Sequence, residues 1–212
     1  LYNTLDAIVW LAEAGEQKKV VSMVGSLSDF FRISLNQGQD ILDVKEELQH
    51  VRSYLEIQQM RYQDILQYEI CVPEELNHCQ IPKITLQPLV ENAIFHGIEP
   101  KGCAGHIRIH VGYETSDNTE KIRIDVTDDG VGMTADKAAQ VLRSNDDSSA
   151  DFFREIGVSN VHKRLQYQFG AEYGITIESK EGEYTTMSIH IPNIPLHNNE
   201  TVSSETISSE NT

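Results

Sequence analysis

Apolar residues recur every three or four positions through the first third of the chain, and this spacing predicts helices. The pattern predicts helix through residues 1–35, a turn over 36–40 and a second helix over 43–62. The apolar positions of the second helix form a narrow seam, which is typical of a helical hairpin or bundle. A thin hairpin needs a partner to cover its apolar face, so residues 1–66 are predicted to be a dimerisation hairpin. A helix packed on its own domain is the alternative.

The pattern changes after residue 66 to short alternating segments mixed with helices. Strands joined mostly by hairpins, with helices between them, predict an α+β fold in which helices cover one face of a sheet. We therefore expect residues 67–192 to form a second domain, a two-layer α/β sandwich. Strands are predicted around 68–72, 107–111, 122–126, 175–177 and 187–191, and helices over 85–97, 134–143 and 158–169.

Two stretches are too polar to predict regular structure. Residues 144–156 are rich in Ser, Asn and Asp, and we expect them to form a flexible loop. Residues 193–212 contain almost no apolar side chains, so burial cannot offset their ordering entropy, and we expect a disordered tail.

The composition narrows the class of protein. Of the 212 residues, 39% are hydrophobic, which is enough to bury a core. The chain has 33 Asp and Glu but only 17 Lys and Arg, and its net charge of −16 disfavours nucleic acid and anionic membrane surfaces as partners. Three cysteines cannot all pair, which indicates a reducing compartment. Because the chain begins with Leu1, we expect it to be a fragment of a longer protein.

A strand that ends in Asp-Asp-Gly-Val-Gly is the first candidate for chemistry. Asp128 shares one face with the apolar residues of 122–126, so its carboxylate is predicted to be at least partly buried and to need a donor, which a ligand amino group could supply. Gly130 and Gly132 permit close approach of the backbone to a ligand. A plain Asp-Gly turn after a strand is the alternative.

The second candidate is the predicted helix over 85–97. Asn92 and His96 are four residues apart and share a polar face beside an apolar stripe. A side-chain amide oxygen suits a magnesium ion that also holds phosphates. A helix with one satisfied polar edge is the alternative.

The third candidate is Gly157, at the point where the polar loop meets a predicted helix. A helix N-terminus there would bind phosphate through free backbone amides, and Lys163 and Arg164 could add positive charge. Thr185 shares the inward face of the last strand, where its hydroxyl could line the same pocket as Asp128. Solvated basic side chains and a hydroxyl bonded to the backbone are the alternatives.

The order and spacing of these segments resemble the ATP-binding domain shared by gyrase, Hsp90, MutL and histidine kinases, the GHKL or Bergerat fold. Leu1-Tyr2-Asn3-Thr4-Leu5 resembles the end of the P-H-F-L-Y-N-T-L segment of LytS/YesM-like sensor histidine kinases. Residues 44–58 and 86–93 resemble the same subfamily, and the resemblance covers residues 1–192.

The resemblance implies that the chain binds ATP with Mg²⁺ and transfers the γ-phosphoryl group to a histidine. This histidine would lie two positions upstream of Leu1, with Asn3 one turn after it on the same helix face. The phosphoryl group would next pass to an aspartate of a response regulator. The resemblance also implies a homodimer. It further implies that this chain is the cytoplasmic portion of a bacterial cell-membrane sensor, which contacts the membrane only through segments that this chain lacks.

The resemblance assigns roles to particular residues. Asn92 would hold Mg²⁺, Asp128 would accept a hydrogen bond from the adenine amino group, and residues 133–156 would form a lid over ATP. The implied ATP-binding residues are Asn92, His96, Asp128, Gly130, Gly132, Gly157, Asn160, Arg164 and Thr185.

The chain also departs from the family pattern. Pro88 stands where ATPases of this superfamily carry a water-activating Glu, which favours transfer to a side chain over hydrolysis. Phe95 stands where many histidine kinases have Lys, and Glu155 and Tyr184 replace two customary glycines. A degenerate nucleotide-binding dimer adaptor and an ATP hydrolase are therefore the alternative functions. His50 is an alternative acceptor, although a lone helical histidine is typically packed or solvated.

Overall fold

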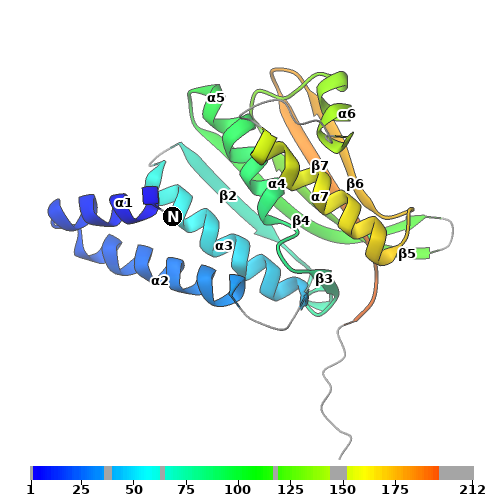
Figure 1. Cartoon of the computed structure of the whole chain (residues 1–212), viewed down its shortest axis with the longest axis horizontal. Coiled ribbons are helices and arrows are strands. Elements are labelled where there is room, and N and C mark those ends of the chain that lie inside the picture. The colour runs from blue at the N-terminus through cyan, green and yellow to red at the C-terminus, as the bar shows by residue number, and fades with distance from the viewer. Residues whose placement is uncertain (1, 36–39, 63–64, 117–118, 144–151, 196–212) are drawn as a thin grey trace, which may run out of the picture.

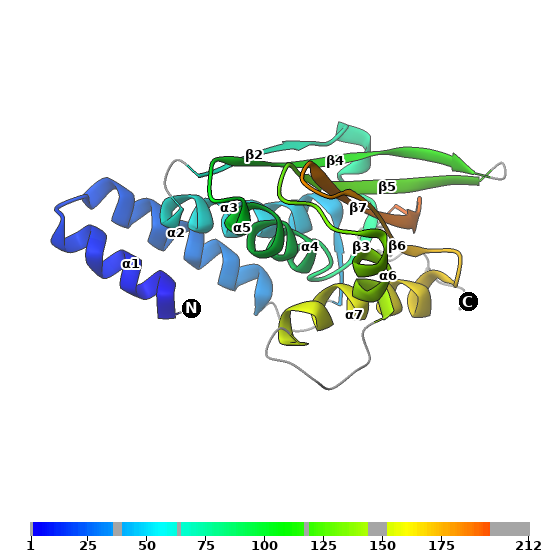
Figure 2. The ribbon, with the colours of Figure 1, turned by 90° about the horizontal axis from the view of Figure 1, so that it is seen from above.

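The computed structural model describes residues 2–35, 40–62, 65–116, 119–143 and 152–195. The helices lie on one face of a five-stranded sheet, and the first two helices project from one end of the molecule (Figures 1 and 2). This arrangement confirms the predicted α+β fold with an N-terminal helical part and a two-layer sandwich. Within the described ranges, no helix combines the length and the apolar character that crossing a bilayer requires.

The predicted first helix is two helices, α1 (Tyr2–Glu13) and α2 (Gln17–Ser34), which corrects the expectation of one helix through residue 35. Gly15 ends α1 with a left-handed φ of 76°. The amide of Gly15 donates to the carbonyl of Ala12, and the amide of Glu16 donates to that of Leu11 at 2.9 Å. These two bonds make a Schellman motif, which satisfies the last carbonyls of a helix and reverses the chain.

The third helix, α3 (Val44–Arg61), begins at a capping box formed by Asp43 and Glu46. Its residues Val51 and Leu55 belong to the same hydrophobic core as the strand residue Ile124. α3 is thus packed on the sandwich, as the alternative to a free-standing hairpin predicts. The domain boundary after residue 66 stays a prediction. The hydrophobic core contains residues from both sides of it.

The sheet has the strand order β2-β4-β5-β7-β6. β2 pairs with β4 in parallel, and all other neighbours are antiparallel. A separate two-stranded sheet joins β1 to β3; at three residues each, these strands are too short for the sequence pattern to predict. The bounds are β1 (Ile41–Asp43), β2 (Leu66–Cys71), β3 (Gln80–Pro82), β4 (Gly105–Ser116), β5 (Thr119–Asp128), β6 (Gly174–Lys180) and β7 (Tyr184–Pro192).

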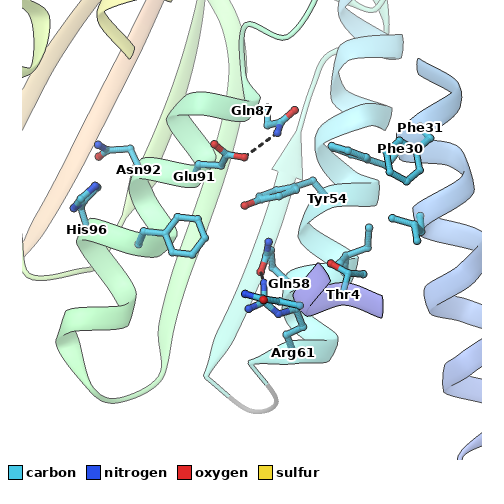
Figure 3. A pocket seen from close by; sticks show the side chains of 14 residues that line it. Thr4, Phe30, Phe31, Tyr54, Gln58, Arg61, Gln87, Glu91, Asn92 and His96 are labelled. Atoms are coloured by element: carbon cyan, nitrogen blue, oxygen red, sulfur yellow. Dashed lines mark hydrogen bonds between the residues drawn. The ribbon is translucent and has the colours of Figure 1, made fainter. Parts of the chain in front are cut away.

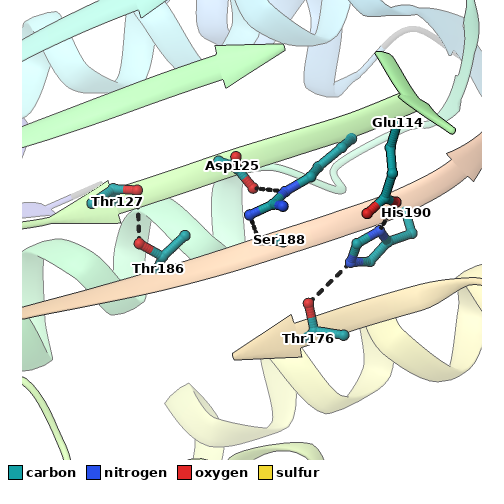
Figure 4. A network of polar contacts seen from close by, with 8 residues as sticks. Glu114, Asp125, Thr127, Thr176, Thr186, Ser188 and His190 are labelled. Carbon is teal, nitrogen blue, oxygen red and sulfur yellow. Dashed lines mark hydrogen bonds and ion pairs between the residues drawn. The ribbon is translucent and has the colours of Figure 1, made fainter. Parts of the chain in front are cut away.

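The two faces of the sheet differ in polarity, as the period of two requires. Alternate residues such as Ile124 of β5 and Ile189 of β7 pair on the face that the helices cover. Polar side chains pair across strands on the other face (Figure 4). There the Thr127 and Thr186 hydroxyls lie 2.9 Å apart, and His190 bonds Glu114 at 2.7 Å.

The labelled helices after β3 lie on the same face of the sheet as α3 (Figure 2). α4 (Gln87–Asn92) continues directly into a π-helix, η2 (Ala93–Ile98), so the helix predicted over 85–97 is confirmed with a widened second half. The other short elements are η1 (Glu74–Leu76), α5 (Glu99–Lys101) and α6 (Ala135–Arg143).

The helix α7 (Phe152–Phe169) begins earlier than the sequence predicts. Gly157 therefore lies inside this helix, and the expected helix N-terminus at Gly157 is wrong. The glycine lets α7 pack closely on α4 at this point, because a Cβ at Gly157 would lie 3.2 Å from the Cβ of Pro88. Of the predicted loop over 144–156, residues 144–151 lie outside the described residues.

The start of the predicted disordered tail is paired, which corrects that prediction for residues 193–195. The amide of Gln80 donates to the carbonyl of Ile194 at 2.8 Å, and Pro195 forms a β-bridge with Cys79. These residues extend past the end of β7 along the edge of β3. Residues 196–212 lie outside the described part of the chain.

Candidate functional site

A cavity of about 350 Å³ lies between the N-terminal helices and the α4–η2 helix. It brings together three residues that the sequence singled out: Asn3 of α1, Asn92 of α4 and His96 of η2. The full lining is Asn3, Thr4, Leu27, Phe30, Phe31, Tyr54, Ile57, Gln58, Arg61, Gln87, Glu91, Asn92, Phe95 and His96.

The α4–η2 helix presents two polar faces (Figure 3). Gln87 and Glu91 point toward Tyr54 of α3, and the Gln87 amide donates to the Glu91 carboxylate at 2.8 Å. Asn92 and His96 lie on the other side of the same helix, one turn apart, as their spacing predicts. Asn92 is 7% exposed and stands at the junction of α4 with the π-helix, a geometry that is frequent at functional sites.

The side chain of Asn92 fits the part of a magnesium ligand. Magnesium is commonly held by one or two protein oxygens together with substrate phosphates and water, so a single amide oxygen on a cavity wall suffices. Among the described residues, no group of three or more His, Cys, Asp and Glu side chains could hold a metal by itself. Any magnesium held through Asn92 would thus depend on the phosphates of a bound nucleotide.

Asp128 ends β5 and is 3% exposed, as the strand pattern predicts. Its Oδ1 accepts a hydrogen bond from the amide of Gly130 at 2.9 Å. Burial, with a smaller contribution from the charge of Asp129, raises the pKa of Asp128 to about 7, although the Gly130 amide and the charge of Lys101 oppose the shift. The carboxylate lies directly against Gly97, where an added Cβ would come within 2.2 Å of Oδ1. Asp128 therefore adjoins the helix that carries Asn92.

The loop after Asp128 is held on both sides by backbone. The amide of Val131 donates to the carbonyl of Gly97 at 3.0 Å, and the carbonyl of Val131 accepts from Gly182 at 2.6 Å. A Cβ at Gly130 would lie 2.3 Å from the Gly97 carbonyl carbon, and one at Gly132 would lie 2.1 Å from a carbonyl oxygen of the β6–β7 turn. In this structure the glycines allow close approach of the protein's own backbone, whereas the sequence predicted an approach to a ligand.

Thr185 is buried and lies opposite Asp128 in the register of β5 and β7. Its hydroxyl bonds the Ser179 hydroxyl at 2.9 Å, and Ser179 accepts from the amide of Met133 at 2.8 Å. Sequence reasoning missed Ser179, which ties the loop after Gly132 to the last hairpin. Thr185 thus adjoins Asp128 but is engaged with a neighbouring side chain.

The cavity lining does not include the predicted residues Asp128, Gly130, Gly132 and Thr185, nor the three predicted residues on α7. Gly157 is inside the helix, and Asn160 is exposed on its surface. Arg164 donates to the carbonyl of Ile84 at 2.9 Å and to the Thr85 hydroxyl at 3.0 Å. The nucleotide contact predicted for Arg164 stays a prediction.

Three polar residues of α3 line the cavity although sequence reasoning assigned them no role. Tyr54, Gln58 and Arg61 are spaced four and three apart, so they share one helix face. Arg61 donates to the Gln58 side chain at 2.9 Å. Burial and the charge of Glu91 raise the pKa of the Tyr54 hydroxyl, which stays protonated. Polar residues recurring at helical spacing beside the apolar seam were the signal that could have identified this wall.

His50 is packed rather than accessible. Its side chain is fully buried, its Nε2 lies 2.8 Å from the Ser34 hydroxyl, and its ring stacks on Phe30 with centroids 4.6 Å apart. Burial lowers the pKa of His50 to about 4. A neutral ring enclosed between α2 and α3 supports the packed alternative over a phosphoryl acceptor.

The burial of Asp128 gives the free energy of unfolding a specific pH dependence. Its pKa of about 7 lies above the ordinary value of 3.8, so the native state keeps a proton that the unfolded state releases. As the pH rises from about 4 to 7, this group lowers the free energy of unfolding by up to about 1.4 kcal/mol per pH unit. We expect Asp128→Asn to remove this slope, measured by urea unfolding at about pH 5, 6 and 7.

Other buried groups also contribute to the pH dependence of the unfolding free energy, so the effect of Asp128 is measured as a difference between variant and wild type. His50 has a lowered pKa, and its contribution to stability grows as the pH rises toward its ordinary value of 6.5. A difference in unfolding free energy between wild type and Asp128→Asn that stays constant over this pH range would contradict the raised pKa of Asp128.

Two family profiles match the chain. Residues 82–195 match the family described as "Histidine kinase-, DNA gyrase B-, and HSP90-like ATPase". Residues 1–66 match the family described as "Histidine kinase".

Two curated relatives are named sensor histidine kinases, and one solved structure of similar fold is a histidine kinase domain. The chain is 38% identical over 194 residues to sensor histidine kinase YesM of Bacillus subtilis and 30% identical over 192 residues to sensor histidine kinase BtsS of Escherichia coli, covering 91% of this chain in each case. It spans only 31% of the length of either relative. The histidine kinase domain of a blue-light activated kinase from Erythrobacter litoralis has a similar fold, with a TM-score of 0.52 and 12% identity over 86% of this chain and 83% of that domain.

Proposed function

We propose, because this chain belongs to the family of histidine kinase-, DNA gyrase B- and HSP90-like ATPases, that it is the ATP-binding catalytic portion of a sensor histidine kinase. It binds ATP with Mg²⁺ and transfers the γ-phosphoryl group to a histidine that precedes Leu1 in a longer protein. One observation carries this proposal: Asn92, the candidate magnesium ligand, and Asn3, on the helix that would follow the acceptor, line the same cavity.

For transfer of the γ-phosphoryl group, the protein mainly has to position the reacting groups. A nitrogen of the acceptor imidazole attacks the γ-phosphorus, the bond to the bridging oxygen breaks, and ADP leaves. Asn92 and His96 would face the transferred group, and a Mg²⁺ held by Asn92 would supply positive charge against that of the phosphates. Asp128 accepts a hydrogen bond from the adenine amino group, and this donor stabilises the ionised carboxylate against the cost of its burial.

The longer protein acts in partnership with other chains. We propose a homodimer, supported by large apolar side chains that α1 and α2 expose: Val9 is 56%, Trp10 60% and Val21 73% exposed. The phosphoryl group passes from the histidine to an aspartate of a response regulator. This chain is the cytoplasmic portion of a bacterial cell-membrane sensor, and its partners do not include nucleic acid.

Pro88 favours transfer over hydrolysis. It occupies the position of the water-activating Glu of related ATPases, and its side chain packs against Gly157 of α7 instead of facing a reacting water. A proline offers no group that can take a proton from water.

Labelling with γ-³²P-ATP tests the proposal. We expect this chain to bind Mg-ATP without becoming labelled, because the acceptor lies outside it, and the full-length natural protein to acquire an acid-labile label. Binding is measured as a shift in melting temperature, since a ligand at about 100 times its dissociation constant adds about 2.7 kcal/mol to the free energy of unfolding.

Other outcomes identify the alternatives. A stoichiometric acid-labile label on this chain alone would place the acceptor within residues 1–212 and contradict the proposed upstream histidine. No melting shift at millimolar nucleotide would support a degenerate adaptor. Steady release of phosphate that Asn92→Ala abolishes would support an ATP hydrolase.

A further inference from the structure

A buried carboxylate outside the cavity joins α3 to the start of α4. Glu47, on α3, is 0% exposed. Its Oε1 accepts hydrogen bonds from the amides of Thr85 at 2.7 Å and Leu86 at 2.8 Å, and its Oε2 accepts from the amide of Ile84 at 3.0 Å. Burial raises the pKa of Glu47, whereas the three amides and the charge of Arg164 lower it. Three amide donors give this buried carboxylate the partners that its desolvation demands.

Arg164 of α7 holds the same segment from the other side. Its Nη2 donates to the carbonyl of Ile84 and to the Thr85 hydroxyl, and that hydroxyl donates to the carbonyl of Pro82 at 2.5 Å. Residues 84–86 are therefore bonded to α3 through their amides and to α7 through their oxygens. We refer to Glu47, Arg164 and residues 84–86 as the clamp.

The clamp imposes an uncommon backbone conformation. Ile84 has a φ of 57°, and it is the one residue other than glycine with a positive φ among those that the structure describes. A β-branched residue is strained in the left-handed region, so this conformation persists only where neighbouring groups hold it. The successive amides turn to one side and form a concave anion site, which Glu47 already fills. The three amides therefore bind the carboxylate of Glu47 and are not available to a phosphate.

The clamp connects two walls of the cavity. Leu86 is the N-cap of α4, and Asn92 is the last residue of that helix, about 9 Å further along its axis. The helix of Glu47 supplies Tyr54 and Arg61 to the opposite wall. Glu47 therefore links the start of the helix that carries Asn92 to α3.

We propose that Glu47 is a positioning residue for phosphoryl transfer, which holds residues 84–86 so that α4 presents Asn92 to the cavity shared with α1 and α3. This inference rests on the proposed function. Glu47 does not line the cavity, so its loss acts through the placement of Asn92 and not through a contact with the nucleotide. Small misplacements of a reacting geometry lower the rate strongly while leaving most of the binding energy intact.

The test is Glu47→Gln in the full-length natural protein. This variant keeps the shape of the side chain but turns one acceptor into an amide donor that faces other donors. We expect kcat for transfer to fall about 10-fold or more, with the KM for Mg-ATP changing less than about threefold. In this chain, hydrogen exchange should rise at the amides of residues 84–86 and of α4. The control is Glu46→Gln, which alters the exposed neighbour that caps α3 and touches none of residues 84–86; it should change neither readout.

The other possible results contradict either the role of Glu47 or the proposed function. Wild-type kcat in a folded Glu47→Gln overturns the inference, and so does an equal loss of kcat and nucleotide affinity, which indicates a general structural role. If Glu47→Gln does not fold, Arg164→Lys keeps the charge but loses the fork of donors; an intermediate fall in kcat is expected, and wild-type kcat overturns the inference. Absence of transfer by the wild type contradicts the proposed function instead, and the hydrogen exchange then still tests the clamp.

Discussion

The Asn92→Ala variant is expected to lose Mg²⁺-dependent binding of ATP and at least about 100-fold of the phosphoryl-transfer rate. Asn92 is buried on the cavity wall, and among the described residues no group of three or more His, Cys, Asp and Glu side chains could hold the metal by itself. Removing the amide leaves the phosphates without the ion that orients them and balances their charge. The measurements are the Mg²⁺-dependent melting shift with ATP in this chain and the rate of labelling in the full-length protein.

The matched control is Gln87→Ala, on the same helix and in the same cavity. Gln87 points toward α3 and bonds Glu91, whereas Asn92 lies on the other side of the helix (Figure 3). We expect Gln87→Ala to keep its Mg²⁺-dependent melting shift. A wild-type shift in Asn92→Ala, or equal losses in both variants, would contradict the role of Asn92 as the magnesium ligand.

The Gly132→Ala variant is expected to lose about 3 kcal/mol or more of unfolding free energy and with it most nucleotide binding. Gly132 has a φ of 63°, and an added Cβ would lie 2.1 Å from the carbonyl oxygen of Lys180. Backbone cannot rotate away as a side chain can, so the loop after Asp128 must move off the β6–β7 turn. Chemical unfolding of this chain and its melting shift with Mg-ATP measure the two effects.

Gly15 separates the strain of the backbone from the clash. It also has a left-handed φ, at 76°, but an added Cβ there meets nothing within 4 Å. Gly15→Ala should therefore cost only about 1 kcal/mol and leave nucleotide binding unchanged. Equal costs at Gly15 and Gly132 would show that close packing of the loop contributes nothing.

Residues on regular periods were predictable. The burial of Asp128 follows from its place two positions after Val126 on an alternating strand, and the common face of Asn92 and His96 follows from their spacing. Gly15 also marks the end of α1 in the sequence, but the apolar residues keep a helical spacing on both sides of this turn, so the pattern predicts one continuous helix. The early start of α7 was not predictable, because polar residues before Gly157 are compatible with a loop and with a helix.

Residues whose partners are distant in the sequence were not predictable. Glu47 interrupts an apolar helix face, which indicates a buried carboxylate, but nothing local identifies three amides 37 to 39 residues away as its partners. Arg164 suggests a phosphate ligand by its charge and position, yet it bonds residues 79 and 80 positions earlier.

The sequence by itself therefore determined the fold class and the order of helices and strands. It also determined that Asn92 and His96 share a helix face and that Asp128 lies on the buried face of its strand. These depend on periodicity and local chemistry, which are properties of short segments. Only the tertiary structure decided that Asn3 and Asn92 share a cavity, that Arg164 bonds Thr85, and that Glu47 bonds the amides at the start of α4. Such contacts depend on how packed helices are placed in space, and the free energy that selects that placement is spread over the whole core.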